Sequence, residues 1–366
     1  MVICTAIGVS LCWQHFVTRV RSQWLLFSYI AALVIPTVTN SFSKANMLEG
    51  MTLVALACLG IAWGSAPIRI SSSSLILLAI VGSGLSIAAM ILLPRVLVAD
   101  RLFRQTLPGS DVFGNGDVAG VFAFAPVLAV LSAVGVLVAL AFPSSVPGSS
   151  KLSWIWATLV AITVVISGSA SNRVALLCAM VLFLFVRATS RQKPEWRLFL
   201  PVFIVVLSSL IFSQVSSEGI VGRSPDLTGR IPLWREIARH LNEISLFGEG
   251  RGSGWSDMGP LNKSVITTTV GWDAGQSHNS FLEAFLTGGL PAVVLLVAVL
   301  MAPPWRSRHN IQARLLSLPI AAYLALVGLF DSVLVLPGFA FLLLAWFSQF
   351  TENILRSTCF HERQSY

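Results

Sequence analysis

Charged residues are scarce in this chain. Only 11% of its 366 residues are charged, whereas an average soluble domain holds about 25%. Hydrophobic residues make up 55%, and the mean hydropathy is +0.80. A soluble protein of this length buries only about 75% of its chain surface, so it could not hide this much apolar surface from water. The composition therefore excludes a soluble globular protein and predicts an all-α polytopic membrane protein.

Paired cysteines and a nucleic-acid-binding surface are also missing. None of the five cysteines has CxxC or metal-ligand spacing, and four lie in or beside apolar runs, where a thiol serves as a small packing residue. The net charge is +8, but no basic stripe with interleaved aromatic residues is present. Most basic residues instead lie in short loops between apolar runs. We therefore expect neither a disulfide framework nor a nucleic-acid partner.

Long apolar runs dominate what is present. Crossing the bilayer takes about 20 apolar residues, and the sequence predicts about 10–12 transmembrane helices. The candidate spans are 1–13, 24–39, 47–66, 74–94, 118–142, 152–169, 174–186, 198–215, 279–302, 313–330 and 333–350. The first is either a short helix or the remainder of a longer one, and no signal-peptide cleavage is expected. The last two could instead form one re-entrant unit, since Asp331 and Ser332 interrupt them.

Basic loops set the predicted orientation. The loop 187–197 carries four basic residues and one acid, and the loop 303–314 carries three arginines and no acid. Short loops rich in Lys and Arg lie on the cytoplasmic side, which places the polar segment 216–277 and the turn 169–173 outside. Residues 95–117 also fall outside despite their arginines. The predicted parts are N-terminal transmembrane helices (1–215), a large extracytoplasmic loop (216–277), C-terminal transmembrane helices (278–350) and a cytoplasmic tail (351–366).

The large loop is predicted to carry ordered structure. Its charges nearly cancel, with six basic and seven acidic residues. Across 232–244, apolar residues recur every three to four positions, which predicts a short amphipathic helix that could act as a lid, and Pro232 suits its first turn. The apolar positions are Leu233, Ile237, Leu241 and Ile244. Four glycines between residues 248 and 254 then indicate a flexible stretch.

Three polar motifs converge on the predicted outer face. Arg173 stands at the outer end of one span and is followed after three residues by Leu177. Arg230 leads into Trp234 on the amphipathic helix. The third motif begins with His278-Asn279; Gly288 stands nine positions after Asn279 and is followed by Gly289-Leu290-Pro291-Ala292. These motifs, together with the Asn-containing segment 113–117, resemble the O-antigen ligase and polymerase family of bacterial membrane glycosyltransferases. The resemblance runs from residue 104 to residue 350. Where the family has a final glycine this chain has Ala292, which affects helix packing more than chemistry.

The resemblance implies a reaction and a site. A glycan would move, with inversion, from a polyprenyl (undecaprenyl) diphosphate carrier to an acceptor sugar hydroxyl outside the bacterial plasma membrane. His278 would accept the hydroxyl proton, since histidine is a base near neutral pH. Arg173 and Arg230 would hold the diphosphate, because arginine offers a planar, always charged fork to phosphate. Asn279 and Glu283 would support the site.

The same resemblance bears on cofactors and partners. Metal-dependent sugar transfer uses clustered carboxylates around a hard cation, and the predicted outer face has no Asp-x-Asp motif. We therefore expect no metal and no other cofactor. The expected partners are the lipid-linked glycan donor, a glycan or glycolipid acceptor, membrane lipid and other polysaccharide-assembly proteins.

Each candidate residue also has a structural interpretation. Arg173 could snorkel at a helix end, and Arg230 could be a helix-start charge, although the helix dipole opposes a cation there. His278 could cap the span 279–302. Glu283 lies about one turn further along that span, where a free charge is costly, and could orient His278 or Arg230 or be protonated.

Several functions remain open from the sequence. A polymerase joins one lipid-linked repeat to another, whereas a ligase moves the finished glycan to a different acceptor. Nothing marks a lipid A core partner, which favours the polymerase. A transporter or flippase of lipid-linked oligosaccharide would place ionisable residues or broken helices near the midplane in paired halves, and neither is evident here. A scaffold without catalysis would leave the His278 motif and the outer arginines unexplained.

Overall fold

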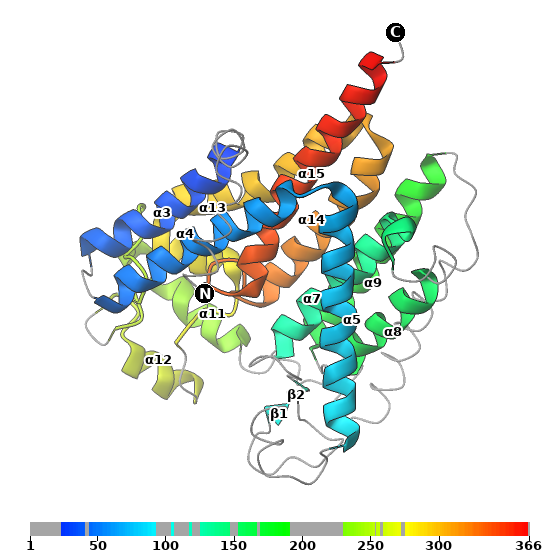
Figure 1. Cartoon of the computed structure of the whole chain (residues 1–366). Helices are drawn as coiled ribbons and strands as arrows, with labels where there is room; N and C mark the ends of the chain where they lie inside the picture. Colours follow the sequence, from blue (N-terminus) through cyan, green and yellow to red (C-terminus); the bar gives the residue numbers. More distant parts are fainter. Residues whose placement is uncertain are drawn as a thin grey trace. The chain divides into compact units, whose positions relative to one another are not determined.

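The computed structural model describes residues 23–40, 44–92, 104–105, 117–118, 125–146, 153–166, 169–190, 230–252, 254–256, 259–271 and 275–364. These residues form helices and their connections, apart from two short antiparallel strands, β1 (Arg104–Gln105) and β2 (Asp117–Val118) (Figure 1). The all-helical character of the membrane part is therefore confirmed. The predicted spans 1–13 and 198–215 lie outside the described residues.

The chain divides into two compact units. The first unit comprises Met1–Ser65, Arg223–Trp305 and Leu324–Gln349, and the second comprises Ala66–Gly222, Arg306–Tyr323 and Phe350–Tyr366. The described helices of the first are α3 (Trp24–Asn40), α4 (Lys44–Ser65), α11 (Arg230–Arg239), η5 (Leu241–Glu243), α12 (Lys263–Val270) and α13 (Ser280–Arg306). Those of the second are α5 (Ile68–Leu92), α7 (Ala125–Ala141), η2 (Pro143–Ser145), α8 (Ser153–Ile166), α9 (Ala170–Thr189) and η6 (Ser307–His309). The helices α14 (Ile311–Phe330) and α15 (Phe339–Gln364) belong partly to each.

Many helices are long and apolar enough to cross a membrane. Among the described residues, five such segments are Met47–Ser65, Ile68–Leu85, Ser171–Thr189, Ser280–His309 and Ile311–Phe330. Shorter apolar helices run over Trp24–Asn40, Val127–Ala141 and Ser153–Val165. These segments coincide with predicted spans, because the length of an apolar run and its lack of charge decide whether a helix can cross the hydrocarbon. The chain is a multi-pass membrane protein.

Two helices extend more than five residues beyond a predicted end. α5 begins at Ile68 rather than 74, and the hydroxyl of Ser72, in its serine-rich first turns, donates to the carbonyl of Ile68 at 2.6 Å. α15 continues to Gln364, through most of the predicted cytoplasmic tail. In that extension Arg356 Nε lies 3.2 Å from Glu352 Oε1, a pairing one helical turn apart that supports an exposed helix.

Small residues let the helices of the second unit approach closely. A side chain on Gly135 of α7 would place its Cβ 2.5 Å from the Cβ of Ala79 on α5. Buried hydroxyls join the same helices, since Ser83 and Ser132 lie 3.2 Å apart. Small residues and hydroxyl pairs are how membrane helices associate where lipid supplies no hydrophobic driving force.

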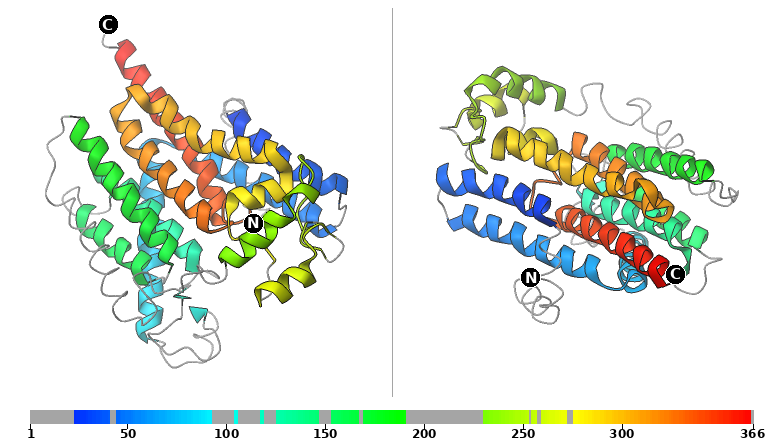
Figure 2. Two further views of the ribbon diagram at one scale, coloured as in Figure 1. Left: turned by 180° about the vertical axis from the view of Figure 1, so that it is seen from behind. Right: turned by 90° about the horizontal axis from the view of Figure 1, so that it is seen from above.

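Equivalent contacts hold the first unit together. Figure 2 shows α3 and α4 running side by side (blue). The hydroxyl of Tyr29 on α3 donates to the carbonyl of Leu334 at 3.2 Å, and Gln23 Nε2 donates to Gln349 Oε1 at 2.9 Å. On α4, the missing side chain of Gly60 admits the backbone of α15, whose Leu342 oxygen would otherwise lie 2.6 Å from a Cβ. The segment after α14 is thereby fixed beside α3.

Candidate active site

His278 stands where the large loop meets α13, and its backbone is unusual. Its φ is +50°, and among the described residues only Asn262 is another non-glycine residue with positive φ. Such a conformation costs about 1–3 kcal/mol and persists only where its surroundings impose it. The side chain is half-buried. The geometry of the predicted base is therefore set by its neighbours.

Both backbone polar groups of the residue before His278 are hydrogen-bonded. Ser277 is fully buried, and its carbonyl accepts a 2.7 Å hydrogen bond from the indole Nε1 of Trp234 on α11. Its N–H donates to Glu283 Oε2 at 2.7 Å, while Trp255 Nε1 donates to the other carboxylate oxygen at 3.2 Å. Two tryptophans and one carboxylate thus fix the peptide that leads into His278. We call Trp234, Trp255, Ser277 and Glu283 the Ser277 clamp.

The residue after His278 caps α13. Asn279 Oδ1 accepts from the N–H groups of Phe281 and Leu282 at 2.9 and 3.1 Å, which satisfies two donors at the helix start. The Ser280 hydroxyl donates to the carbonyl of Asp331 at 2.6 Å and accepts from Leu334 N at 3.1 Å. Asn279 is therefore the N-terminal cap of α13, and the connection between α14 and α15 bonds the neighbouring Ser280.

Glu283 has partners other than the expected ones. It lies in the first turn of α13 and is buried, and its two carboxylate oxygens bond Ser277 and Trp255. A carboxylate in the first turn is also favoured by the helix dipole. Glu283 therefore contacts the peptide that leads into His278, whereas the sequence offered His278 or Arg230 as its partner, or a protonated carboxyl.

α13 is broken at Gly289. There φ is +67° and ψ is −163°, outside the helical range. A segment of the large loop supplies the missing partners: Leu290 N donates to Leu246 O at 2.9 Å, Glu249 N to Leu286 O at 2.9 Å, and Gly250 N to Thr287 O at 3.0 Å. A Cβ on Gly289 would lie 2.0 Å from Leu246 O. Glycine is therefore required where the loop inserts into the helix.

Two of the four glycines predicted to form a flexible stretch are packed against backbone. Gly248 and Gly250 both have φ near +80°, and a Cβ on either would lie under 3 Å from backbone atoms, of Thr287 and of Pro36 respectively. These glycines serve close approach rather than flexibility. They hold the loop against the break in α13.

The large loop has its own small core. Its buried residues are Leu233, Ile237, Ile244, Trp255, Leu261, Ile266 and Leu286, and Trp234, Leu282 and Phe285 pack against them. The predicted helix is present but runs over Arg230–Arg239, and the 3-10 turn η5 follows it. Leu241 lies in that turn and is 37% exposed, so its expected place on the apolar face was wrong. The change of helical period after Arg239 turns it outward.

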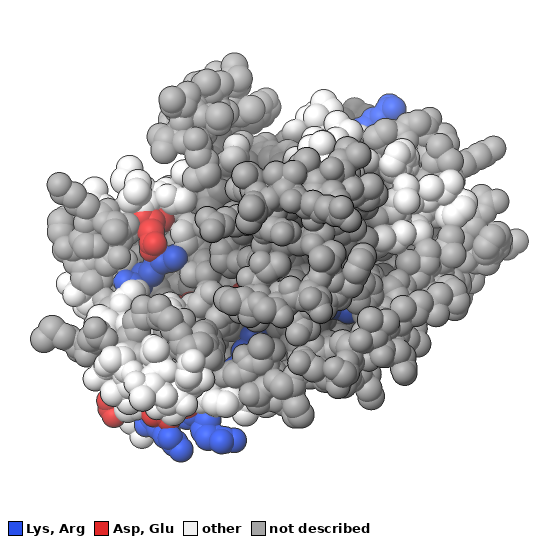
Figure 3. Space-filling model, turned by 90° about the horizontal axis from the view of Figure 1, so that it is seen from below, with Lys and Arg blue, Asp and Glu red and all other residues white. Residues whose placement is uncertain are grey.

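Charged side chains of the loop form small mixed groups. Arg239 Nη1 lies 2.6 Å from Glu236 Oε2, and His240 Nδ1 lies 3.1 Å from Glu243 Oε1. Figure 3 shows basic and acidic side chains beside one another in such groups. This pairing agrees with the nearly balanced charge of the loop.

Arg230 belongs to the same unit as His278. It is the first residue of α11 and is half-buried. Residues four apart on a helix lie on one face, so Arg230 is one turn from Trp234, whose indole holds the Ser277 peptide. α11 thus joins a predicted phosphate ligand to the predicted base.

Arg173 lies in the second unit, in the first turn of α9. Its N–H donates to the carbonyl of Ser169 at 3.1 Å, and its side chain is half-buried. The neighbouring Asn172 is fully buried, bonds Ser169 Oγ at 2.8 Å, and accepts a hydrogen bond from the hydroxyl of Tyr323. The turn that carries Arg173 is therefore fixed by buried polar contacts.

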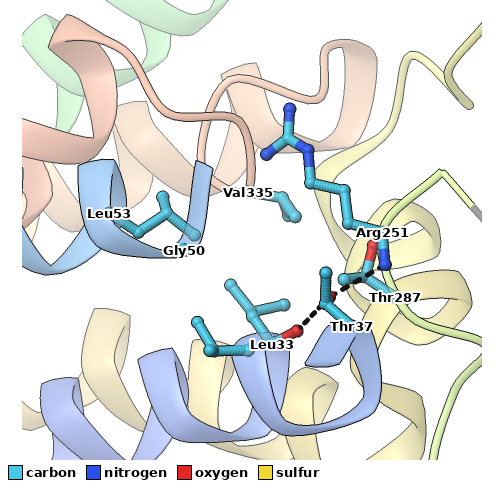
Figure 4. A pocket seen from close by; sticks show the side chains of 8 residues that line it. Leu33, Thr37, Gly50, Leu53, Arg251, Thr287 and Val335 are labelled. Carbon is cyan, nitrogen blue, oxygen red and sulfur yellow. Dashed lines mark hydrogen bonds between the residues drawn. The ribbon is translucent and has the colours of Figure 1, made fainter. Parts of the chain in front are cut away.

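Arg251 is a half-buried cation that sequence reasoning missed. Its Nε pairs with Glu49, and its N–H donates to Thr37 Oγ1 at 2.9 Å. Burial lowers the pKa of Arg251, while the carboxylates of Glu49 and Glu283 oppose that shift. Figure 4 shows its guanidinium directed into a pocket with apolar walls, whose free volume of about 10 Å³ admits a single water molecule at most. This pocket is too small for a sugar.

The missed residues share one reason. Trp255 and Arg251 act on α13 and α4 from a loop more than 20 residues away in sequence, so no local pattern connects them. The one available signal was the placement of Arg251 between two glycines, which marks a charged residue at a close backbone approach.

Residues 155–297 match the sequence model of O-antigen ligase, a range that contains Arg173, Arg230 and His278. This range of the chain matches the O-antigen ligase family. Members of this family are membrane glycosyltransferases that act on lipid-linked glycans, so the chain is an enzyme. The match is narrower than the range 104–350 over which motifs resemble the family. A search of curated proteins gave no match.

The O-antigen ligase match covers the site described above. It begins in α8 and ends in α13, just beyond the break at Gly289. Its boundaries thus enclose α9 with Arg173, the large loop with Arg230, and the cap at Asn279. The matched range therefore carries all five residues singled out from the sequence.

Proposed function

We propose that the protein transfers a glycan from a polyprenyl diphosphate carrier, such as undecaprenyl diphosphate, to a hydroxyl of an acceptor sugar. The observation that carries this proposal is the geometry of His278. Its left-handed backbone directly follows the Ser277 clamp, and Trp234 of that clamp lies one turn from Arg230. A surface histidine without a task would not need such support.

The reaction needs one base and one cationic site. His278 accepts the proton of the acceptor hydroxyl while that oxygen forms a bond to the anomeric carbon of the donor sugar. The bond between this carbon and the diphosphate oxygen breaks at the same time, and the carrier diphosphate leaves with the bonding electrons. Attack from the face opposite the leaving group inverts the anomeric carbon. Neither a metal nor another cofactor enters this scheme.

The leaving diphosphate gains negative charge as the bond breaks. Arg230 from α11 and Arg173 from α9 bind it, because fixed cations stabilise charge that develops in the transition state. Glu283 and Asn279 act through the backbone on either side of His278. We place this chemistry outside the bacterial plasma membrane, since the basic loops 187–197 and 303–314 favour the cytoplasmic side.

The acceptor distinguishes two forms of this function. A polymerase adds one lipid-linked repeat to another, and a ligase adds the finished glycan to a different glycolipid. Purified protein in vesicles, supplied with a polyprenyl diphosphate oligosaccharide alone, should give a ladder of lengthening chains if it is a polymerase. A single size increase that appears only after a second glycolipid is added indicates a ligase. Passage of donor across the bilayer without a new glycosidic bond would refute both.

A further inference from the structure

Two large apolar side chains stand exposed at the tip of a tight turn in the loop. The turn 245–248 is closed by Gly248 N donating to Ser245 O at 2.9 Å, and Phe247 N donates to Ser245 Oγ at 3.2 Å. Leu246 and Phe247 occupy its two central positions and are 66% and 71% exposed. Among the described residues, no large hydrophobic side chain is more exposed than Phe247. Central turn positions are ordinarily polar residues, glycine or proline.

This turn adjoins the apolar surface of α13. The carbonyl of Leu246 accepts the N–H of Leu290, the first residue after the break. From there the exposed apolar side chains follow one face of the helix, since they recur every three to four residues. They are Leu290, Val294, Val297 and Met301. This segment is part of a helix apolar enough to cross a membrane, so the face it exposes meets lipid.

The part of α13 after the break is short for a membrane span. At about 1.5 Å per residue, 290–306 is about 25 Å long, against about 30 Å of hydrocarbon. The part before the break, 280–288, does not extend this lipid face, because Leu282, Phe285 and Leu286 pack into the core of the loop. Leu246 and Phe247 therefore lie at the end of the lipid-facing surface of α13, where that surface is shorter than the hydrocarbon is thick.

We propose that the turn 245–248 inserts Leu246 and Phe247 into the membrane interface and docks the large loop on the bilayer that holds the protein. The loop backbone then transmits this depth to the site, because Glu249 N and Gly250 N bond the carbonyls of Leu286 and Thr287. On the function proposed above, this docking sets the height of His278 relative to the carrier diphosphate. Lipid is favoured over a protein partner because the tip continues a lipid-facing helix surface.

Depth measurement tests the docking without any assay of transfer. A Phe247→Cys variant, in a background with the five native cysteines replaced by serine, is labelled with an environment-sensitive fluorophore and placed in nanodiscs at one copy per disc. We expect blue-shifted emission and quenching by nitroxide lipids, at about 5–10 Å below the headgroups. Thr268→Cys on α12 is the matched control, because this exposed loop residue should report water. Equal, water-like emission at both positions overturns the proposal.

A second copy or a protein partner would give a different pattern. Emission that is blue-shifted only when several copies share a vesicle, and becomes water-like at one copy per disc, assigns the tip to a protein contact and refutes lipid docking. Phe247→Ser should raise the KM for a long-chain lipid-linked donor, and Phe247→Trp should restore it, while kcat changes little in both. If wild-type protein transfers no glycan, the proposed function fails, but the depth result still decides the docking.

Discussion

Trp234→Phe is the substitution that isolates the support of His278. Phenylalanine keeps an aromatic ring against the loop core but removes the indole N–H that bonds the Ser277 carbonyl at 2.7 Å. Ser277 is fully buried, so its carbonyl cannot turn to water for a replacement. The variant thus alters the geometry of His278 without touching its ring.

The size of the effect follows from two energies. Leaving a buried acceptor without a partner costs about 1–3 kcal/mol, and the left-handed backbone of His278 stores about the same amount of strain. Removing the restraint lets that strain relax, so the productive geometry becomes a minor state. A loss of about 1–3 kcal/mol in the transition state lowers kcat by about 5- to 150-fold.

The assay compares kcat and donor KM for purified variants in vesicles. A positioning role predicts a lower kcat for Trp234→Phe with donor KM within about twofold, since an interaction made only in the transition state affects kcat. Trp305→Phe is the matched control, because that indole is largely exposed at the end of α13. If Trp234→Phe retains full kcat, or if both variants lose activity equally, the Ser277 clamp does not position His278.

Three further predictions test other parts of the account. Gly289→Ala should lower the free energy of unfolding by more than about 2 kcal/mol, since its Cβ would meet Leu246 O. Gly252→Ala, which has positive φ but open space around it, should lower it by only about 1 kcal/mol. Equal shifts in Tm for the two variants would contradict the insertion of the loop into α13. Arg230→Lys should raise donor KM and lower kcat, because the point charge of lysine does not replace the bidentate guanidinium of arginine. Arg239→Lys on the same helix should leave both constants unchanged. Equal effects of the two substitutions would remove Arg230 from the diphosphate site. Transfer should continue in the presence of a chelator, and strict dependence on magnesium would refute the metal-free scheme.

The sequence was sufficient for the membrane helices. Run length and charge predict a span well because both are local properties, and α13 begins within one residue of its predicted start. The helical turns of the loop were also foreseen from the spacing of Leu233 and Ile237, both fully buried. Leu241 was misplaced because spacing alone does not show that a helix ends at Arg239.

Contacts between distant segments could not be predicted in the same way. The break in α13 depends on the loop around Leu246, which supplies a carbonyl where the helix has lost one. In the sequence, Gly289 merely interrupts an apolar run. The sequence offered His278 or Arg230 as a partner of Glu283, or a protonated carboxyl, but its partners Trp255 and Ser277 are brought to it only by the folded loop. The candidate residues could be identified from the sequence, whereas the contacts that hold them in place could not.

The claim that His278 is the base of a glycosyl transfer is tested most directly by comparing two histidine variants. Purified wild-type protein, His278→Ala and His240→Ala are each supplied with a polyprenyl diphosphate oligosaccharide and acceptor, and new glycosidic bonds are counted in a single turnover. His240 lies in the same loop and pairs with Glu243, so it controls for the loss of an imidazole. Wild type and His240→Ala should give product, and folded His278→Ala should give none. Product at the wild-type rate from His278→Ala would contradict the role of His278 as the base.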